Sequence, residues 1–243
     1  MLLGVPNQIN ASTRGDVKIV EASENIRYLS QKIAKEYLYL YYNPKKINLK
    51  NKLSENMKEL EKNIYQININ TQSDDSKDIL SFLSYTNEEI KLLLEQEATK
   101  DISILILDYS ETFIEASTSI QVLHQYDFSK EEKMLMHIKE LEYLLERVTK
   151  YYIASIMNLN KISNTQQMQK TLKEIEDTLK IIKAYSYPKK IKTEQEKIIK
   201  SWKIHKDFLT ISSELAVPNL LSLSIKNFKD NIKILELYHK KNQ

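Results

Sequence analysis

Apolar residues recur at three- and four-residue steps along nearly the whole chain, with polar residues between them, which is the period of an amphipathic helix. Eight narrow apolar stripes follow one another: Ile19 to Leu40, Leu53 to Ile67, one beginning near Thr86, Ile102 to Leu123, Ile138 to Leu159, Met168 to Ile182, Ile198 to Leu209 and Leu221 to Leu235. Narrow stripes joined by short connections are typical of up-and-down bundles. The pattern predicts an all-α fold of two tandem up-and-down four-helix bundles.

Local signals suggest where these helices begin and end. Asn43-Pro44 should end the first helix, because the residue before a proline disfavours helical geometry. The Ser/Thr-x-x-Glu/Gln spacing of a capping box predicts helix starts at Thr86, Ser129, Ser163 and Thr193, and Pro218 is expected in the first turn of the eighth helix. Only Asp127-Phe128 separates the fourth and fifth helices, which predicts one long, nearly continuous rod shared by the two bundles.

The chain contains an internal repeat. YLSQKIAKEYL at 28–38 returns as YLLERVTKYYI at 143–153, and MKELEKNI at 57–64 returns as LKEIEDTL at 172–179, both at an offset of 115 residues. Near the end of each half, SIQVLHQY at 119–126 resembles NIKILELY at 231–238, with the offset slipped by three. A duplicated unit of this size predicts two domains, 1–127 and 128–243.

Composition narrows the class of protein. Two glycines and four prolines in 243 residues favour long uninterrupted helices. The net charge of +3 comes from lysines and glutamates that alternate along the chain, which does not indicate nucleic-acid binding. Without cysteine, the chain has no disulfide, thiolate or zinc–thiolate chemistry. No apolar run approaches the length of a membrane span, and MLLGVPNQIN lacks the features of an intact signal peptide. We therefore expect either a cytosolic protein or an exported domain whose targeting segment has been removed.

One segment carries a resemblance to a known family. NIRYLSQKIAK at 25–35, followed by Tyr37-Leu38, resembles the first-helix motif of PilJ-type sensor domains, the N-terminal domains of type IV pilus methyl-accepting chemotaxis transducers. Nitrate/nitrite-sensor kinases of the NarX kind carry a related helix. The repeat at 142–153 fits the motif more weakly, so the resemblance covers both halves in pattern but is specific only over 25–38. Glu24 and Asn25 stand where the family has a glycine and its first arginine.

The resemblance implies an anion-binding residue. In the related nitrate sensors the middle arginine of the motif, contributed by two subunits, grips one anion at a dimer interface; in this sequence that position is Arg27. Its counterpart in the repeat is Glu142, so a two-arginine clamp would need a homodimer through the first helix. The implied ligand is a small anion: nitrate or nitrite first, or a carboxylate.

Helix geometry allows two interpretations of Arg27. A guanidinium suits flat oxyanions, and Ser23 and Gln31, four residues to either side, share its face and could add donors. Alternatively, Arg27 forms an ordinary ion pair with Glu24, one turn earlier. Both interpretations remain open at this stage.

Signals of catalysis or metal binding are missing from the sequence. We find no phosphate-binding glycine loop and no nucleophile elbow. Glu236-x-x-His239 has the spacing of half a di-iron site, but a bundle site needs a second such motif and none exists. His205 and His239 lie on apolar stripes, where a packing role is the commoner one. We predict a protein that is not an enzyme and needs no cofactor.

Two functions from different classes fit these features. The first is a periplasmic sensory protein that binds a small anion and signals through a membrane-bound histidine kinase or chemoreceptor, as the resemblance implies. The second is a helical scaffold or protein-interaction module without a small ligand, because bundles serve many functions.

Overall fold

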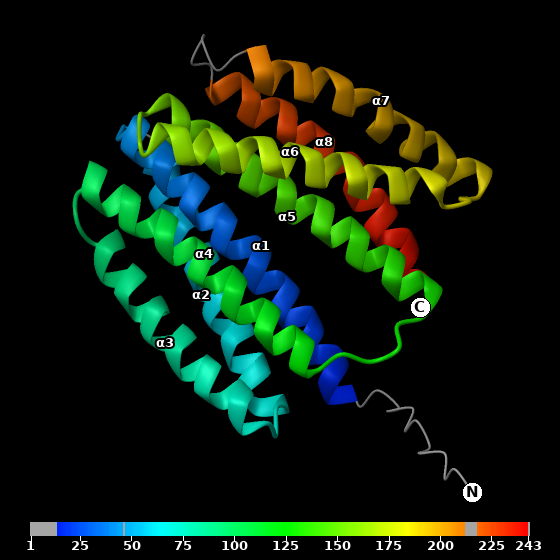
Figure 1. Ribbon diagram of the computed structural model, residues 1–243, viewed down its shortest axis with the longest axis horizontal. Helices are drawn as coiled ribbons and strands as arrows, with labels where there is room; N and C mark the ends of the chain where they lie inside the picture. Colours follow the sequence, from blue (N-terminus) through cyan, green and yellow to red (C-terminus); the bar gives the residue numbers. More distant parts are fainter. Residues whose placement is uncertain (1–13, 46, 212–217, 243) are drawn as a thin grey trace, which may run out of the picture.

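The computed structural model describes residues 14–45, 47–211 and 218–242, and these form eight helices without any strand (Figure 1). The helices are α1 (Arg14–Tyr42), α2 (Ile47–Asn70), α3 (Asp74–Leu94), α4 (Lys100–Leu123), α5 (Lys130–Ile156), α6 (Lys161–Ala184), α7 (Lys189–Ile211) and α8 (Pro218–Lys241). The predicted all-α fold is confirmed. Over these same residues, none of the helices combines the length and apolar character that crossing a bilayer requires.

The helices pack as two four-helix units. In the first, α1 packs against α2 and α4, and α3 lies against α2 and α4; in the second, α5 packs against α6 and α8, and α7 lies against α6 and α8. The two units meet through α1 and α5, which lie side by side in the centre of the molecule (Figure 1). The boundary expected at residue 127 falls in the connection between α4 and α5.

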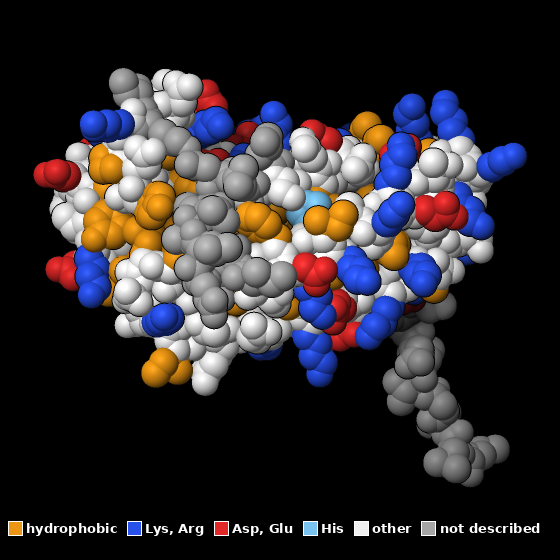
Figure 2. Space-filling model, turned by 90° about the horizontal axis from the view of Figure 1, so that it is seen from above, with side chains coloured by type: hydrophobic (Ala, Val, Ile, Leu, Met, Phe, Trp, Pro, Cys, Tyr) orange, Lys and Arg blue, Asp and Glu red, His pale blue; other side chains and the backbone are white. Residues whose placement is uncertain are grey.

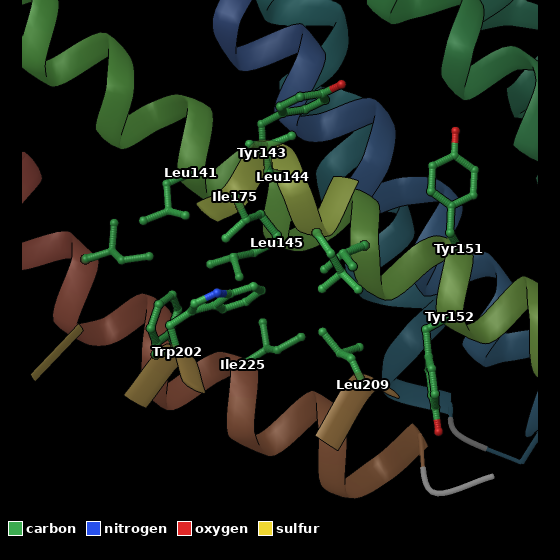
Figure 3. Close-up of a cluster of buried hydrophobic side chains, with 14 of the residues drawn as sticks. Leu141, Tyr143, Leu144, Leu145, Tyr151, Tyr152, Ile175, Trp202, Leu209 and Ile225 are labelled. Carbon is green, nitrogen blue, oxygen red and sulfur yellow. The ribbon is translucent and has the colours of Figure 1, made fainter. Parts of the chain in front are cut away.

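Because α1 and α5 have neighbours on three sides, they are buried around most of their circumference. Both bury polar as well as apolar side chains, among them Glu24 and Gln31 on α1 and Glu146 and Lys150 on α5. The buried apolar residues form two clusters, and the cluster of the second unit also includes Leu38, Tyr39 and Leu107 of the first, so apolar packing crosses from one unit to the other. Figure 3 shows Trp202 of α7 inside this core, among side chains of α5, α6 and α8.

The buried positions correct one detail of the repeat. With a constant offset of 115 residues, the buried Ile106, Phe113 and Ile120 of α4 correspond to the buried Leu221, Phe228 and Leu235 of α8. The constant offset therefore extends through the fourth helix of each half without the three-residue slip inferred from 119–126 and 231–238. A shift of three moves residues nearly once around a helix, so the slipped alignment preserves a similar apolar pattern.

Three predicted helix starts were also wrong. Thr86 and Thr193 lie inside α3 and α7, where each hydroxyl donates to the backbone carbonyl four residues earlier. α3 begins instead after Ser73, whose side chain accepts from the Ser76 backbone N–H. α6 begins at Lys161, two residues before Ser163. A threonine with glutamate three residues later occurs both at caps and on helix faces, so its spacing does not locate a start by itself. The capping box at Ser129 is confirmed.

The continuous central rod was wrong as well. α4 ends at Leu123 and α5 begins at Lys130, and the chain reverses direction between them (Figure 1). The Ser129 cap explains the break, because its extended backbone and its hydrogen bond to the Glu132 N–H begin a new helix. Side-chain contacts between the bundles, such as those where α1 meets α5, therefore take the place of a shared helix.

Candidate functional site: a polar seam between the bundles

The repeated motif itself forms the surface where the two bundles meet. We use "seam" for the facing sides of α1 and α5 together with the side chains that α4 and α8 add at its edges. Tyr28 and Tyr143, and likewise Lys35 and Lys150, occupy equivalent positions of the repeat, and all four contribute to the seam. The two motifs therefore face each other within one chain.

Arg27 is held by carboxylates of both bundles. Its guanidinium lies 2.9 Å from Glu24 Oε1 and 2.9 Å from Glu140 Oε2, and it stacks 4.4 Å above the Tyr143 ring. Burial alone would lower the pKa of Arg27, but the two carboxylates raise it above its ordinary value. The ion pair with Glu24, one of the two interpretations left open by the sequence, is present, and Glu140 adds a second pair that the sequence did not suggest.

The two residues expected to assist Arg27 point to other partners. The Ser23 hydroxyl donates to the Ile19 carbonyl in its own helix at 2.9 Å. Gln31 Nε2 donates to the Ser110 carbonyl of α4 at 3.0 Å. Both side chains are fully buried. Ser23, Arg27 and Gln31 therefore share a helix face, but the structure does not gather them around one ligand-sized space.

Glu146 lies at the centre of the seam. Its carboxylate accepts from Lys35 of α1 at 2.5 Å and from Lys229 of α8 at 2.5 Å, and its side chain is only 1% exposed. Burial would raise the pKa of Glu146, but Lys229 and Lys35 lower it far below its usual range. Lys229 also donates to the Tyr28 hydroxyl at 2.6 Å. Glu146 thus joins three helices from both bundles.

Lys150, the repeat counterpart of Lys35, is buried on the other side of the seam. Its ammonium donates to the Ser110 hydroxyl at 2.9 Å and to Glu111, both on α4. Glu111 also pairs with Arg147. Burial lowers the pKa of Lys150 from 10.5 to about 8, against the opposing effect of Glu111. Lys150 should therefore make stability depend on pH.

We expect the free energy of unfolding to rise with pH between about pH 8 and pH 10.5 because of Lys150. In this window the unfolded chain keeps the Lys150 proton and the folded chain has lost it, so raising the pH favours the folded state, and the contribution disappears as pH falls through 8. Denaturant titrations at about pH 7.5 and 9.5 give the free energy of unfolding at each pH. Between these two pH values it should rise by about 2 kcal/mol more in the unmodified chain than in a Lys150→Met variant. An equal pH dependence in both proteins would contradict the assignment.

Two adjoining cavities lie along the groove between α1 and α8. The first, of about 470 Å³, is lined by Glu21, Glu24, Asn25, Tyr28, Lys139, Glu142, Lys229, Asp230, Lys233, Glu236 and Lys240. The second, of about 450 Å³, is lined by Tyr28, Lys32, Lys35, Glu36, Lys52, Glu55, Asn56, Glu146, Thr149, Ile225, Lys226, Lys229 and Asp230. We call the second the lysine cavity. None of Arg27, Ser23 and Gln31 lines either cavity.

Three lysines from the two bundles line the lysine cavity: Lys32 and Lys35 from α1 and Lys229 from α8. Lys35 and Lys229 share one carboxylate, Glu146, whereas the ammonium of Lys32 donates to the amide oxygen of Asn56 at 2.9 Å. Burial lowers the pKa of Lys32; Glu36 and Glu146 act against that shift, and Lys229 and Lys35 add to it. Lys32 is thus a partly buried cation that an entering anion would stabilise.

A histidine paired with a carboxylate lies at the equivalent position of each bundle. His124 Nδ1 lies 3.0 Å from Asp16 Oδ1, and His239 Nδ1 lies 2.6 Å from Glu131 Oε2. Both the histidines and the acids are related by the 115-residue offset, so the duplicated unit has kept this link between its first and fourth helices. The sequence interpretation missed it because the slipped alignment hid the histidine pair. Among the residues that the structure describes, no group of three potential metal ligands occurs.

These features define an all-α protein of two duplicated bundles joined by a polar, largely buried seam. Comparison with known proteins adds no further identification: no family model, no curated protein and no solved structure matches the chain. The seam is therefore the candidate functional site.

Proposed function

We propose that the chain is a non-enzymatic sensory protein that binds a small anion between its two bundles. The observation that carries the proposal is the lysine cavity, where Lys32, Lys35 and Lys229 approach one another from α1 and α8. A small oxyanion or carboxylate there would replace the neutral partner of Lys32 with a charged one. Charge-assisted hydrogen bonds of this kind are about twice as strong as neutral ones.

The lysine cavity suits an added anion better than the position of Arg27 does. An anion at Arg27 would have to displace Glu24 or Glu140, both of which already neutralise the guanidinium. The hydrogen-bond partner that an anion at Lys32 displaces is an amide oxygen, and the nearby Glu36 carboxylate is itself bound by the same amide group. The expectation of anion binding that the resemblance implies is thus kept, but the proposed site moves along α1 and around to another side of the helix, from Arg27 to Lys32 and Lys35.

Binding could reach a partner through the seam. An anion that drew Lys35 or Lys229 away from Glu146 would weaken the contact between α1 and α5 and favour a different packing of the bundles. A periplasmic location and a membrane-bound histidine kinase or chemoreceptor as partner follow from the resemblance of residues 25–38 to PilJ-type domains. They form part of the proposal on that basis alone, as do nitrate and nitrite as the first ligands to test.

A melting experiment with anions tests this function. Nitrate, nitrite, chloride, sulfate, acetate and a dicarboxylate are compared at constant ionic strength. A ligand present at about 100 times its Kd should stabilise the folded chain by about 2.7 kcal/mol. Lys32→Ala should abolish the shift, whereas Lys62→Ala, an exposed lysine of α2 paired with Glu59, should leave it intact. A shift that survives Lys32→Ala but not Arg27→Ala would return the site to Arg27. No shift with any anion would refute the proposed function.

The second candidate, a protein-interaction module, has separate support. Phe82, Tyr85 and Leu92 on α3 are each more than half exposed. Large apolar side chains that face solvent in a row often mark a surface that binds another protein.

A further inference from the structure

The outward side of α3 combines aromatic and acidic residues in a single stripe. Asp75, Asp78, Phe82, Tyr85, Glu89 and Leu92 follow one another at steps of three and four, so they share one face of the helix. Phe82, Tyr85 and Leu92 are 54%, 62% and 57% exposed. The lysines of α3 lie elsewhere: Lys91 pairs with Glu61 of α2, and Lys77 lines the groove between α2 and α3.

α4 extends this stripe into a surface. Leu105 is 42% exposed, and Tyr109 lies close enough to Glu89 and Tyr85 for both to act on its hydroxyl. Over residues 74–123 the chain has 11 aspartates and glutamates against 3 lysines. Glu111 differs from the acids of the α3 stripe in facing α5, where it pairs with Arg147 and Lys150. The outer side of α3 and α4 is therefore a strongly acidic surface with an apolar stripe, which we call the acidic face.

The equivalent helix of the other bundle has the opposite charge. Buried positions of α3 and α7 match at the offset of 115, as in Leu83 with Ile198, Asn87 with Trp202 and Ile90 with His205. At the same offset, the six positions of the outward stripe of α3 correspond on α7 to Lys190, Thr193, Lys197, Lys200, Ile204 and Asp207. Residues 161–211 carry 12 lysines against 6 acids. The outer side of α6 and α7 is thus a basic face.

The two faces lie at opposite edges of the molecule. α3 and α7 are the outermost helices on either side of the central pair α1 and α5 (Figure 1). Figure 2 looks down on the edge formed by α7, and lysine side chains gather there at the end where α7 begins. One copy can therefore present its basic face to the acidic face of another without blocking its own remaining face.

We propose that the chain associates with further copies of itself, head to tail, with the α7 stripe of one copy on the α3 stripe of the next. The aliphatic stems and ammonium groups of Lys197 and Lys200 suit the exposed rings of Phe82 and Tyr85, while the neighbouring acids of α3 neutralise the lysines. Because the two surfaces differ, the contact is heterologous, and each copy keeps one unoccupied face that can bind the next copy. This association involves neither the lysine cavity nor α1, so it does not depend on the proposed anion site. It also differs from a homodimer through the first helix, because α5 covers the seam side of α1.

Sedimentation velocity of the full chain tests the proposal. At low salt, of about 20 mM, the average sedimentation coefficient should rise with protein concentration. Near 500 mM salt it should fall back towards that of the monomer, since exposed charges are screened beyond a few ångströms. Two variants each remove one face: Phe82→Ser with Tyr85→Ser, and Lys197→Glu with Lys200→Glu. Each alone should weaken association by at least about tenfold.

Mixing the two variants gives the sharpest result. The first variant keeps only its basic face and the second only its acidic face, so the mixture should form a dimer and nothing larger. Tyr65→Ser, which removes an exposed aromatic of α2 outside the stripe, should associate like the unmodified chain. Circular dichroism establishes that every variant is folded. An unmodified chain that stays monomeric at low salt overturns the proposal, as does association that persists in either face variant; a partner of another kind would then have to occupy the acidic face.

Discussion

Replacing Glu146 with alanine is expected to lower the free energy of unfolding by about 3 kcal/mol or more. The substitution leaves Lys35 and Lys229 facing each other, with side chains only 15% and 20% exposed and without the carboxylate that both contact. Removing one partner of a buried ion pair is costly because the remaining charge stays desolvated and uncompensated. Urea titration followed by circular dichroism measures the loss.

A control for this substitution lies one turn earlier on the same helix. Glu142 lines the neighbouring cavity, and burial and Glu236 raise the pKa of its carboxyl. Because its charge is already disfavoured there, Glu142→Ala should cost less than about 1 kcal/mol. The triple variant Glu146→Leu, Lys35→Met, Lys229→Met should recover most of the lost stability, since apolar groups of similar size often replace a buried ion network without loss. If Glu146→Ala costs no more than Glu142→Ala, the seam does not depend on this carboxylate.

The second large effect concerns the two phenylalanines that the repeat makes equivalent. Phe113 on α4 and Phe228 on α8 are both buried, and changing either to alanine should cost about 3–5 kcal/mol through lost burial and the resulting cavity. Because the apolar cluster of the second bundle includes side chains of the first, and ion pairs also join the bundles across the seam, we expect both to unfold in one cooperative transition.

The chain contains one tryptophan, Trp202, which lies in the second bundle and makes this expectation testable. Its fluorescence reports on the second bundle alone, whereas circular dichroism reports on both. Phe113→Ala, in the first bundle, should move the tryptophan transition to lower denaturant as far as Phe228→Ala does. If Phe113→Ala leaves the denaturant midpoint of the tryptophan transition unchanged, the two bundles unfold independently.

The sequence predicts one of the two ion-pair partners of Arg27 but not the other. Helix spacing correctly placed Glu24 within reach of Arg27, because residues three apart on a helix are neighbours whatever surrounds them. Glu140 lies more than a hundred residues away in the sequence, and only the packing of α5 on α1 brings its carboxylate to the guanidinium. The candidate anion site could not be predicted from the sequence either, because Lys229 belongs to α8 and meets Lys32 and Lys35 of α1 only in the folded structure.

The amino-acid sequence by itself determined the helices, their number and the duplication. Apolar spacing of 3.6 residues and the scarcity of glycine and proline act locally, so they can be recognised without knowing the fold. The starts of α3 at Asp74 and of α7 at Lys189 were missed because Thr86 and Thr193 have the residue spacing of a cap while lying inside helices.

The tertiary structure alone decided which polar side chains meet. The buried cluster of Glu146 with Lys35 and Lys229, and the pairing of Lys150 with Glu111, join residues from different helices and from both repeats. Their positions in sequence look like ordinary polar faces, since a lysine that faces solvent and one that faces a carboxylate across a seam have the same helical spacing. What distinguishes them is burial, which makes an unpaired charge costly, and burial follows from the contact between α1 and α5.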